Sequence, residues 1–371
     1  MNQESVAAAS APPAPIYPNW WSKLLFKKKF EQQFFLPIPM SRHEVRTMRW
    51  LEKFLLRAVD LEQIPITQPV FIVGLPRSGT TMLFNLLCAH EQAAYVTNVI
   101  NTLPEAPYAI EWARKKFKWD VVGERFLNDS IEVAFGSPSE PQTLWRRWTG
   151  RDTESLYWSE QTPADLGSER VALIRNDIRK ILYSFGGQNR RFICKYPVLQ
   201  TELRLVQSLF PDAKFIHILR DPRAAANSLV KLYRLTQQQL AKIKHPEFDH
   251  IIPYPRVKGL RSYLDAHGPE SLECTTRVWV ESVELVRATS KDLNHFYEFK
   301  YEDLVAAPQA ELAKLFQFCE LNWPCPENVA FQKEFNKIGK VRHRNAYSGF
   351  EVVEKIAAPL MRELGYLPAS P

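Results

Sequence analysis

The sequence PVFIVGLPRSGTT at residues 69–81 decides the fold of this chain. Residues 70–73 are apolar and mostly β-branched or aromatic, which predicts a buried strand of a parallel sheet. Two glycines and a proline in residues 74–79 end that strand, and helical spacing of apolar residues follows from Gly79. Such a loop directs backbone N–H groups and the positive end of a helix at one point, which predicts a phosphate or sulfate site.

The two glycines of this loop, Gly74 and Gly79, have the spacing of a P-loop. A nucleotide-hydrolysing P-loop places lysine directly after the second glycine, where it reaches the β and γ phosphates. Here that position is Thr80, and the cation of the loop is Arg77. The loop is therefore expected to hold an anion with N–H groups, hydroxyls and a guanidinium. An ordinary βα turn that happens to carry glycine is the alternative, and the order of strand, loop and helix disfavours it.

Composition bounds the class of protein. The 371 residues suffice for one large α/β domain or two smaller ones. With 48 basic and 41 acidic residues, the net charge of +7 fits an anionic ligand or a membrane surface and does not by itself indicate nucleic acid. The five cysteines are odd in number and lie mostly in apolar patterns, which predicts reduced core thiols and a cytoplasmic location. Cys319 and Cys325 lack a matching second pair, so no zinc site is expected.

The N-terminal region precedes the loop and divides into two parts. Residues 1–18 are rich in Ala, Pro and Ser and are predicted to form a disordered tail. Residues 19–36 mix Trp and Phe with Lys, and they suit neither a membrane span nor a signal peptide. They could form a helix lying on a membrane or a partner, or an arm packed on the protein's own surface, which we favour. We therefore expect a helical arm at 19–66 and one domain at 67–371.

Four more segments have the pattern of strands in the same sheet: residues 93–97, 191–195, 214–219 and 296–301. We expect helices between them, which gives an α/β fold with three α/β/α layers, a central parallel sheet and a P-loop-like core. Lys195 ends one strand and Arg220 follows the next. Because ligands bind at the carboxyl ends of parallel strands, both cations are expected near the glycine loop. His217 lies within a strand and is expected to be a core histidine.

Residues 101–165 have a different composition. They hold five of the ten tryptophans, together with polar turns. We interpret the stretch as a helical insertion that covers the acceptor side of the crevice. Its aromatic side chains could bind apolar or sugar faces of an acceptor, although each tryptophan taken alone is more often a core residue.

Two further motifs carry a resemblance to a known family. The segment PRSGTT at 76–81 is followed by ILRDPRAAANSL at 218–229, and segments at 193–215 and 301–308 stand in the expected order. Together they resemble the sulfotransferase superfamily that uses 3′-phosphoadenosine 5′-phosphosulfate (PAPS), most of all its bacterial and tyrosylprotein-type branch.

The resemblance implies roles for individual residues. Four residues of the loop would hold the 5′-phosphosulfate: Ser78, Gly79, Thr80 and Thr81. Arg77 would stabilise charge on the sulfuryl group, and Arg220 with Ser228 would bind the 3′-phosphate. Lys195 matches a lysine that supports charge on the bridging oxygen. Lys340, in a basic loop near the C-terminus, is a weaker candidate for the 3′-phosphate, and no residue can be assigned to the adenine.

One departure concerns the general base. The branch commonly carries a glutamate downstream of the loop, at a position that falls here on Thr97 and Asn98. Three other residues could accept the acceptor's proton: Glu105, Glu140 and His90. We rank Glu105 first because it is the next glutamate downstream of that position.

The function implied is transfer of a sulfuryl group from PAPS to a hydroxyl or amine of a small-molecule, glycan or lipid acceptor. That chemistry resembles phosphoryl transfer and needs positioning and charge stabilisation, so no metal and no nucleic-acid partner is expected. A P-loop kinase or NTPase is one alternative, and a binding protein that keeps the fold without catalysis is another. Membrane contact through residues 19–36 stays open, as does the oligomeric state.

Overall fold

The structure is a computed structural model, and it describes Trp20 and residues 41–124, 132–151, 157–158, 160–242, 252–340 and 349–368. The predicted tail at 1–18 and nearly all of residues 19–36 lie outside the described residues. Within the described chain, no helix combines the length and the hydropathy needed to cross a bilayer.

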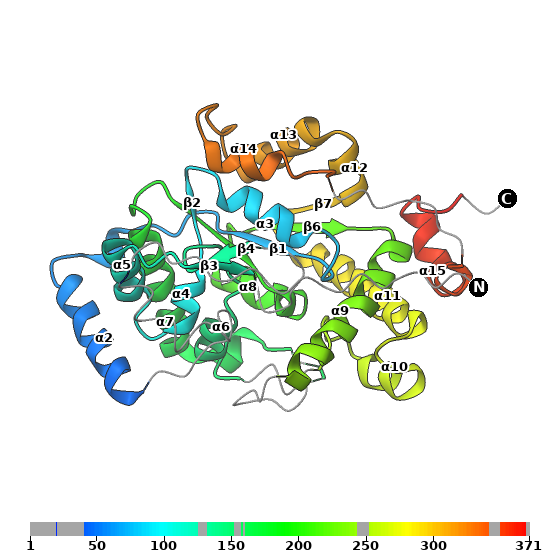
Figure 1. The fold of residues 1–371 in the computed structure, drawn as a ribbon, viewed down its shortest axis with the longest axis horizontal. Helices are drawn as coiled ribbons and strands as arrows, with labels where there is room; N and C mark the ends of the chain where they lie inside the picture. The colour runs from blue at the N-terminus through cyan, green and yellow to red at the C-terminus, as the bar shows by residue number, and fades with distance from the viewer. Residues whose placement is uncertain are drawn as a thin grey trace.

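A parallel sheet of five strands forms the centre of the molecule (Figure 1). Its strands are, in spatial order, β2 (Ala93–Ala94), β5 (Arg191–Lys195), β1 (Val70–Val73), β6 (Lys214–Leu219) and β7 (Phe296–Lys300). The glycine loop thus follows the central strand, between the strands that end at Lys195 and Leu219. The predicted α/β class with a central parallel sheet is confirmed.

Alternate residues of β1 point to opposite faces of the sheet, as the period of a strand requires. Val70 and Ile72 pack on one face, against α3 (Thr80–Cys88) and α13 (Pro308–Cys319). Phe71 and Val73 pack on the other face, in a core that includes residues of α7 (Pro163–Ser184) and α8 (Leu203–Leu209). Figure 1 shows these helices above and below the sheet, which makes the three layers.

The remaining helices complete the two outer layers and the right-hand side of Figure 1. They are α2 (Arg42–Leu55), α4 (Asn98–Thr102), α5 (Pro107–Phe117), α6 (Gln142–Thr149), α9 (Pro222–Lys242), α10 (Leu260–His267), α11 (Leu272–Thr289), α12 (Tyr301–Ala306), α14 (Val329–Phe335) and α15 (Glu351–Glu363). Short 3-10 turns are η1 (Leu61–Gln63), η3 (Pro197–Thr201) and η4 (Ser290–Asp292).

Three local predictions needed correction. The strand expected at 93–97 ends at Ala94, because the Thr97 side chain turns the chain into α4 by accepting from the Ile100 N–H at 3.4 Å. The strand expected at 296–301 ends at Lys300, because Tyr301 is already the first residue of α12. Residues 101–165 contain, besides helices, an antiparallel hairpin of β3 (Val122–Glu124) and β4 (Glu132–Ala134).

Buried polar residues behave largely as the sequence predicts. Four cysteines are buried free thiols, and Cys325 is an exposed one. His217 is buried in β6, where its Nδ1 lies 2.9 Å from the Glu298 carboxylate of β7. It is a core histidine with a partner on the neighbouring strand.

Candidate active site

The loop after β1 requires glycine at two positions. Gly79 has φ of +93°, and a Cβ there would lie 2.5 Å from the ring of Tyr301. Gly74 has φ of +148°, and a Cβ there would lie 2.7 Å from the carbonyl oxygen of Ile218. Gly79 is also the N-cap of α3 and has no side chain that could cap it. The first N–H groups of α3 therefore point at the loop, where an anion can accept from them.

Arg77 connects the loop to the segment after β6. The Arg77 backbone has φ of +76°, and its Nε donates to Ser228 Oγ in α9 at 3.0 Å. Arg220 Nη1 donates to the Arg77 carbonyl oxygen at 2.6 Å. Two arginines and a serine from segments far apart in the sequence thus lie together at the carboxyl ends of β1 and β6, where the sequence predicts the ligand crevice.

Arg220 itself is held from three sides. Its side chain is 5 % exposed, and its guanidinium carbon lies 4.7 Å from the centre of the Tyr301 ring. Trp279 Nε1 donates to the Arg220 carbonyl at 3.1 Å. In the described part of the chain, Arg220 Nε has no hydrogen-bond partner. A buried guanidinium N–H without an acceptor is costly, so this one favours an anionic ligand in the crevice.

A polar network behind Arg220 fixes the end of β6 to the C-terminal helices. Glu302 accepts from the Asp221 N–H at 3.0 Å and from the Tyr366 hydroxyl at 3.2 Å. Arg223 pairs with Asp221 at 2.6 Å and with Glu354 of α15 at 2.9 Å. Burial raises the pKa of Glu302 above its usual range. Arg220 therefore projects from a segment that is bonded to α12, α15 and the residues after α15.

Lys195 reaches the crevice from the other neighbour of β1. It pairs with Ile72 in the sheet register, and its side chain is 9 % exposed. Its Nζ forms an ion pair with the carboxylate of Glu140, which is 41 % exposed. This contact brings Glu140, from the turn before α6, to the end of β5. Of the three candidate bases, Glu140 is the one that the described chain places against a predicted catalytic cation.

The other two candidates have different surroundings. Glu105 lies in the turn between α4 and α5, and within the described chain no hydrogen bond or ion pair joins it to Arg77 or Lys195. His90 lies beyond the far end of α3. Its Nδ1 accepts from the Gln92 N–H at 3.0 Å and its Nε2 faces the Asn322 carbonyl at 2.9 Å. Both ring nitrogens are therefore occupied, which argues against His90 as a base.

Two further predicted positions have been located. Asn98, near the position where the family glutamate was expected, donates through Nδ2 to the Ala134 carbonyl at 2.8 Å and so ties α4 to the hairpin. Lys340 is exposed at the end of the turns after α14. Its side chain has no bond to Arg220 or Ser228 in the part of the chain that is described.

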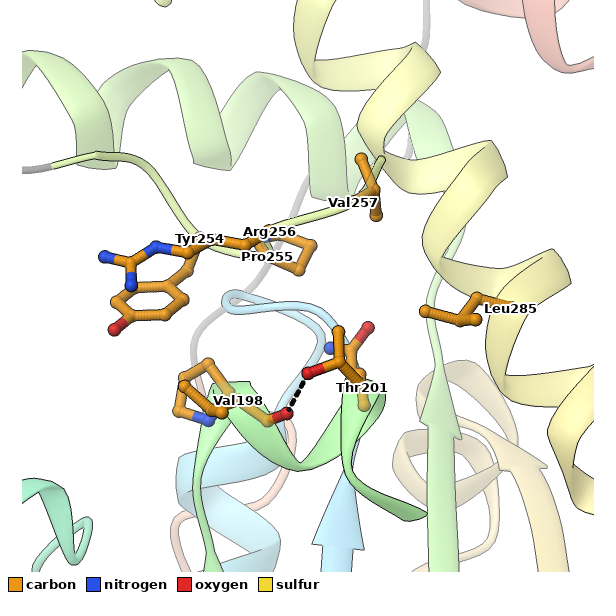
Figure 2. A pocket seen from close by; sticks show the side chains of 9 residues that line it. Val198, Thr201, Tyr254, Pro255, Arg256, Val257 and Leu285 are labelled. Carbon is orange, nitrogen blue, oxygen red and sulfur yellow. Dashed lines mark hydrogen bonds between the residues drawn. The ribbon is translucent and has the colours of Figure 1, made fainter. Parts of the chain in front are cut away.

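Sequence reasoning missed a residue that supports the loop from below. Gln200 Nε2 donates to the Gly74 carbonyl at 2.8 Å, and the Ser282 hydroxyl donates to Gln200 Oε1. Gln200 also lines a small pocket over η3, shown in Figure 2, where the guanidinium of Arg256 lies 4.0 Å from the centre of the Tyr254 ring. The pocket adjoins the loop from the side of α11. Gln200 follows the strand that ends in Lys195, but no sequence signal marks its bond to Gly74, which is made in three dimensions.

The motifs and their geometry agree with a comparison against protein families. The model described as "Sulfotransferase family" matches residues 69–325. This chain belongs to the sulfotransferase family. The match includes the loop after β1, Lys195 and the Arg220–Ser228 segment.

Individual sulfotransferases are distant relatives of the chain. Omega-hydroxy-beta-dihydromenaquinone-9 sulfotransferase Stf3 of Mycobacterium bovis is 27 % identical over 266 residues, which are 69 % of this chain and 63 % of the relative. Protein-tyrosine sulfotransferase A of Caenorhabditis elegans is 23 % identical over 68 % of this chain and 50 % of its own length. The chain thus spans less than two thirds of either relative. The crystal structure of sulfotransferase STF9 from Mycobacterium avium matches in fold, with a TM-score of 0.52 at 13 % identity, covering 88 % of this chain and 85 % of that one.

Proposed function

We propose that the chain transfers a sulfuryl group from PAPS to a hydroxyl, or an amine, of an acceptor molecule. The observation that carries the proposal is the bonded cluster of Arg77, Arg220 and Ser228 at the carboxyl ends of β1 and β6, with Lys195 at the end of the adjacent strand. PAPS has an anionic group at each end of its ribose, and the crevice offers two cationic groups from separate segments. A nucleotide triphosphate would instead call for the lysine that Thr80 replaces.

The donor would be held by the residues that surround the crevice. The N–H groups at the start of α3 and the hydroxyls of Ser78, Thr80 and Thr81 would bind the 5′-phosphosulfate. Arg220 and Ser228 would bind the 3′-phosphate, with Lys340 a weaker addition. When bound, PAPS supplies the sulfuryl group that passes to the acceptor. In such transfers, most of the stabilisation of the transition state comes from fixed cations that face the developing negative charge. Arg77 and Lys195 would supply these cations.

Glu140 is the general base that we propose first, because its carboxylate contacts Lys195. It would accept the proton that the acceptor hydroxyl loses, and the ion pair with Lys195 would keep it oriented. The Glu140 side chain is 41 % exposed, so an acceptor can reach it from solvent. Glu105, which ranked first on the sequence, stays as the second candidate and is tested by the same assay.

The acceptor is proposed to be a small molecule, glycan or lipid, covered by residues 101–165. Trp145 and Trp148 of that stretch are buried in the core against α7, whereas Trp112 and Trp119 are partly exposed. The mycobacterial relative is named for a menaquinone derivative, which has a ring and an apolar chain. An acceptor hydroxyl on a molecule of that chemical class is therefore the first to try.

The test is transfer of labelled sulfate from PAPS to a panel of acceptors that includes hydroxylated quinones, phenols, sugars and lipids. The proposal expects label on at least one hydroxyl or amine acceptor, transferred about 10²–10³-fold more slowly by the Lys195→Ala variant. If the wild-type protein binds the desulfated donor, 3′-phosphoadenosine 5′-phosphate (PAP), but labels nothing in any class, the chain is a binding protein with this fold. If Lys195→Ala transfers as fast as wild type, Lys195 has a structural role only.

A further inference from the structure

Helix α2 has an inner face that the protein core fixes in place. Val45, Met48, Leu51 and Leu55 pack against the core below the sheet. Glu52 is buried at 4 % exposure and accepts from the Tyr108 N–H at the start of α5 at 2.8 Å. Since these contacts set the rotation of α2, its opposite face is fixed toward solvent. Figure 1 shows α2 at the edge of the molecule, beyond α5 and α7.

The outer face of α2 is basic and aromatic. Its basic residues follow one another at helical spacing and are all exposed: Arg42, Arg46, Arg49, Lys53 and, just past the helix, Arg57. In the described chain, no carboxylate forms an ion pair with the first four of these side chains. Beside them Trp50 is 66 % exposed and Phe54 is 48 % exposed, and their rings stack at 5.8 Å. We call these seven residues the α2 outer face.

We propose that the α2 outer face docks the protein on an anionic lipid surface. Basic side chains near a membrane are attracted by acidic headgroups, and tryptophan with phenylalanine inserts at the level of the headgroups. The long arginine stems let the charges stay at the headgroups while the rings enter. This surface is separate from the crevice and does not depend on the proposed transfer reaction.

Two observations favour lipid over a nucleic acid. Base stacking on aromatic side chains needs an open ring face. The ring of Phe54 is instead stacked by Trp50, and the guanidinium of Arg57 lies 4.1 Å from its centre. The chain just before α2 also continues the same composition, because residues 20–35 combine four lysines with further Trp and Phe. Basic and aromatic residues together are the composition that an anionic bilayer attracts.

The experiment measures co-sedimentation of the full-length chain with vesicles. One set of vesicles is phosphatidylcholine alone and the other is phosphatidylcholine mixed with phosphatidylglycerol. The wild-type chain is expected to bind the mixed vesicles and not the neutral ones, and to release them in high salt. The variant R42E/R46E/R49E is expected to bind at least about tenfold more weakly, because each basic residue near an anionic surface contributes to the affinity. The variant W50S/F54S is expected to show a smaller loss.

The matched control reverses three exposed lysines elsewhere: Lys291, Lys333 and Lys355. This control changes the net charge by the same amount and is expected to bind as wild type. An equal loss in the control variant would show that net charge alone acts, and it would overturn the proposal. Unchanged vesicle binding of R42E/R46E/R49E would also overturn the proposal, and it would attribute the binding to the lysines of residues 20–35. If R42E/R46E/R49E unfolds, the W50S/F54S variant is used in its place. Unchanged vesicle binding of W50S/F54S would then overturn the proposal. If R42E/R46E/R49E lost binding to a single-stranded RNA while its binding to vesicles stayed unchanged, the proposal would also be overturned.

Discussion

The proposed donor side of the crevice, around Arg77, and its proposed acceptor side, around Glu140, are built from contacts of different kinds. On the donor side, two hydrogen bonds connect Arg77 to Ser228 and to Arg220, each across more than a hundred residues of sequence. Both segments follow strands of one sheet, so their positions are fixed by the register of β1 and β6. On the acceptor side, Glu140 stands before α6, outside the sheet, and contacts it through Lys195.

This difference shows which residues of a site a short sequence motif can position by itself. A loop after a strand needs only the sheet to bring it to the ligand edge. A carboxylate in an intervening stretch needs the packing of that whole stretch, here α4, the β3–β4 hairpin and α6. The donor side is therefore expected to resemble that of other family members, and the acceptor side to carry the specificity of this chain.

The largest effect should come from the proposed base. Replacing Glu140 with Gln keeps the size of the side chain and removes its ability to accept a proton. Transfer should fall about 10²–10⁴-fold, the usual contribution of a general base. Glu105→Gln is the matched control and should stay near wild type in the labelled-sulfate assay. The reverse result, with Glu105→Gln inactive and Glu140→Gln active, would assign the base to Glu105.

The next effect should come from the cation at the end of β5. Lys195→Ala is expected to lower turnover about 10²–10³-fold, as removal of one charge-stabilising donor does in other enzymes. Lys214→Ala is its matched control, because Lys214 is also a buried strand lysine and pairs with Glu320 at 2.8 Å. Lys214 lies at the start of β6, at the amino ends of the strands and thus away from the proposed site.

Both lysine variants should lose some stability, and only Lys195→Ala should lose turnover. Parallel losses of turnover in the two variants would mean that a buried strand lysine acts through folding alone. Melting curves of both variants, recorded beside the turnover assay, separate the two cases.

The smallest effect concerns the loop backbone. Gly79→Ala introduces a Cβ at positive φ and against the Tyr301 ring, whereas Gly268→Ala has positive φ and nothing within 4 Å. Positive φ should lower the free energy of unfolding by about 1–2 kcal/mol in both variants. The contact with Tyr301 should cost Gly79→Ala about 1–3 kcal/mol more. Equal losses in denaturant unfolding would contradict the described contact between the loop and α12.

The sequence predicted the parts of the fold that follow from local patterns. The strands at 70–73, 191–195 and 214–219 have the predicted bounds, because buried strands of a parallel sheet are continuous apolar runs. The residues proposed to hold the donor could be named for the same reason, since strand, loop and helix lie together in sequence. The pairing of Lys195 with Glu140 was not predicted, because it depends on how residues 132–151 fold back over the sheet.

Tyr301 and Gln200 show a second limit of the sequence. Tyr301 was predicted as the last residue of a strand, and Gln200 follows a predicted strand, yet the roles of both depend on contacts with the loop made in three dimensions. Nothing in a tyrosine or a glutamine at such a position marks it as a support of Gly79 or Gly74. The roles of Tyr301 and Gln200 can be assigned only once their contacts with the loop after β1 are known.

The central claim is that Arg77 and Arg220 bind the two ends of one doubly phosphorylated adenosine. The most direct measurement is the rise in melting temperature with PAP, compared with ATP and Mg²⁺, because a ligand that binds only the folded state stabilises it. We predict a rise with PAP that is lost in Arg220→Met. The rise with PAP should be kept in Arg191→Met, which alters a half-buried arginine at the start of β5, at the amino ends of the strands. A rise with ATP and Mg²⁺ alone, or an Arg220→Met variant that responds to PAP as wild type does, would contradict the account.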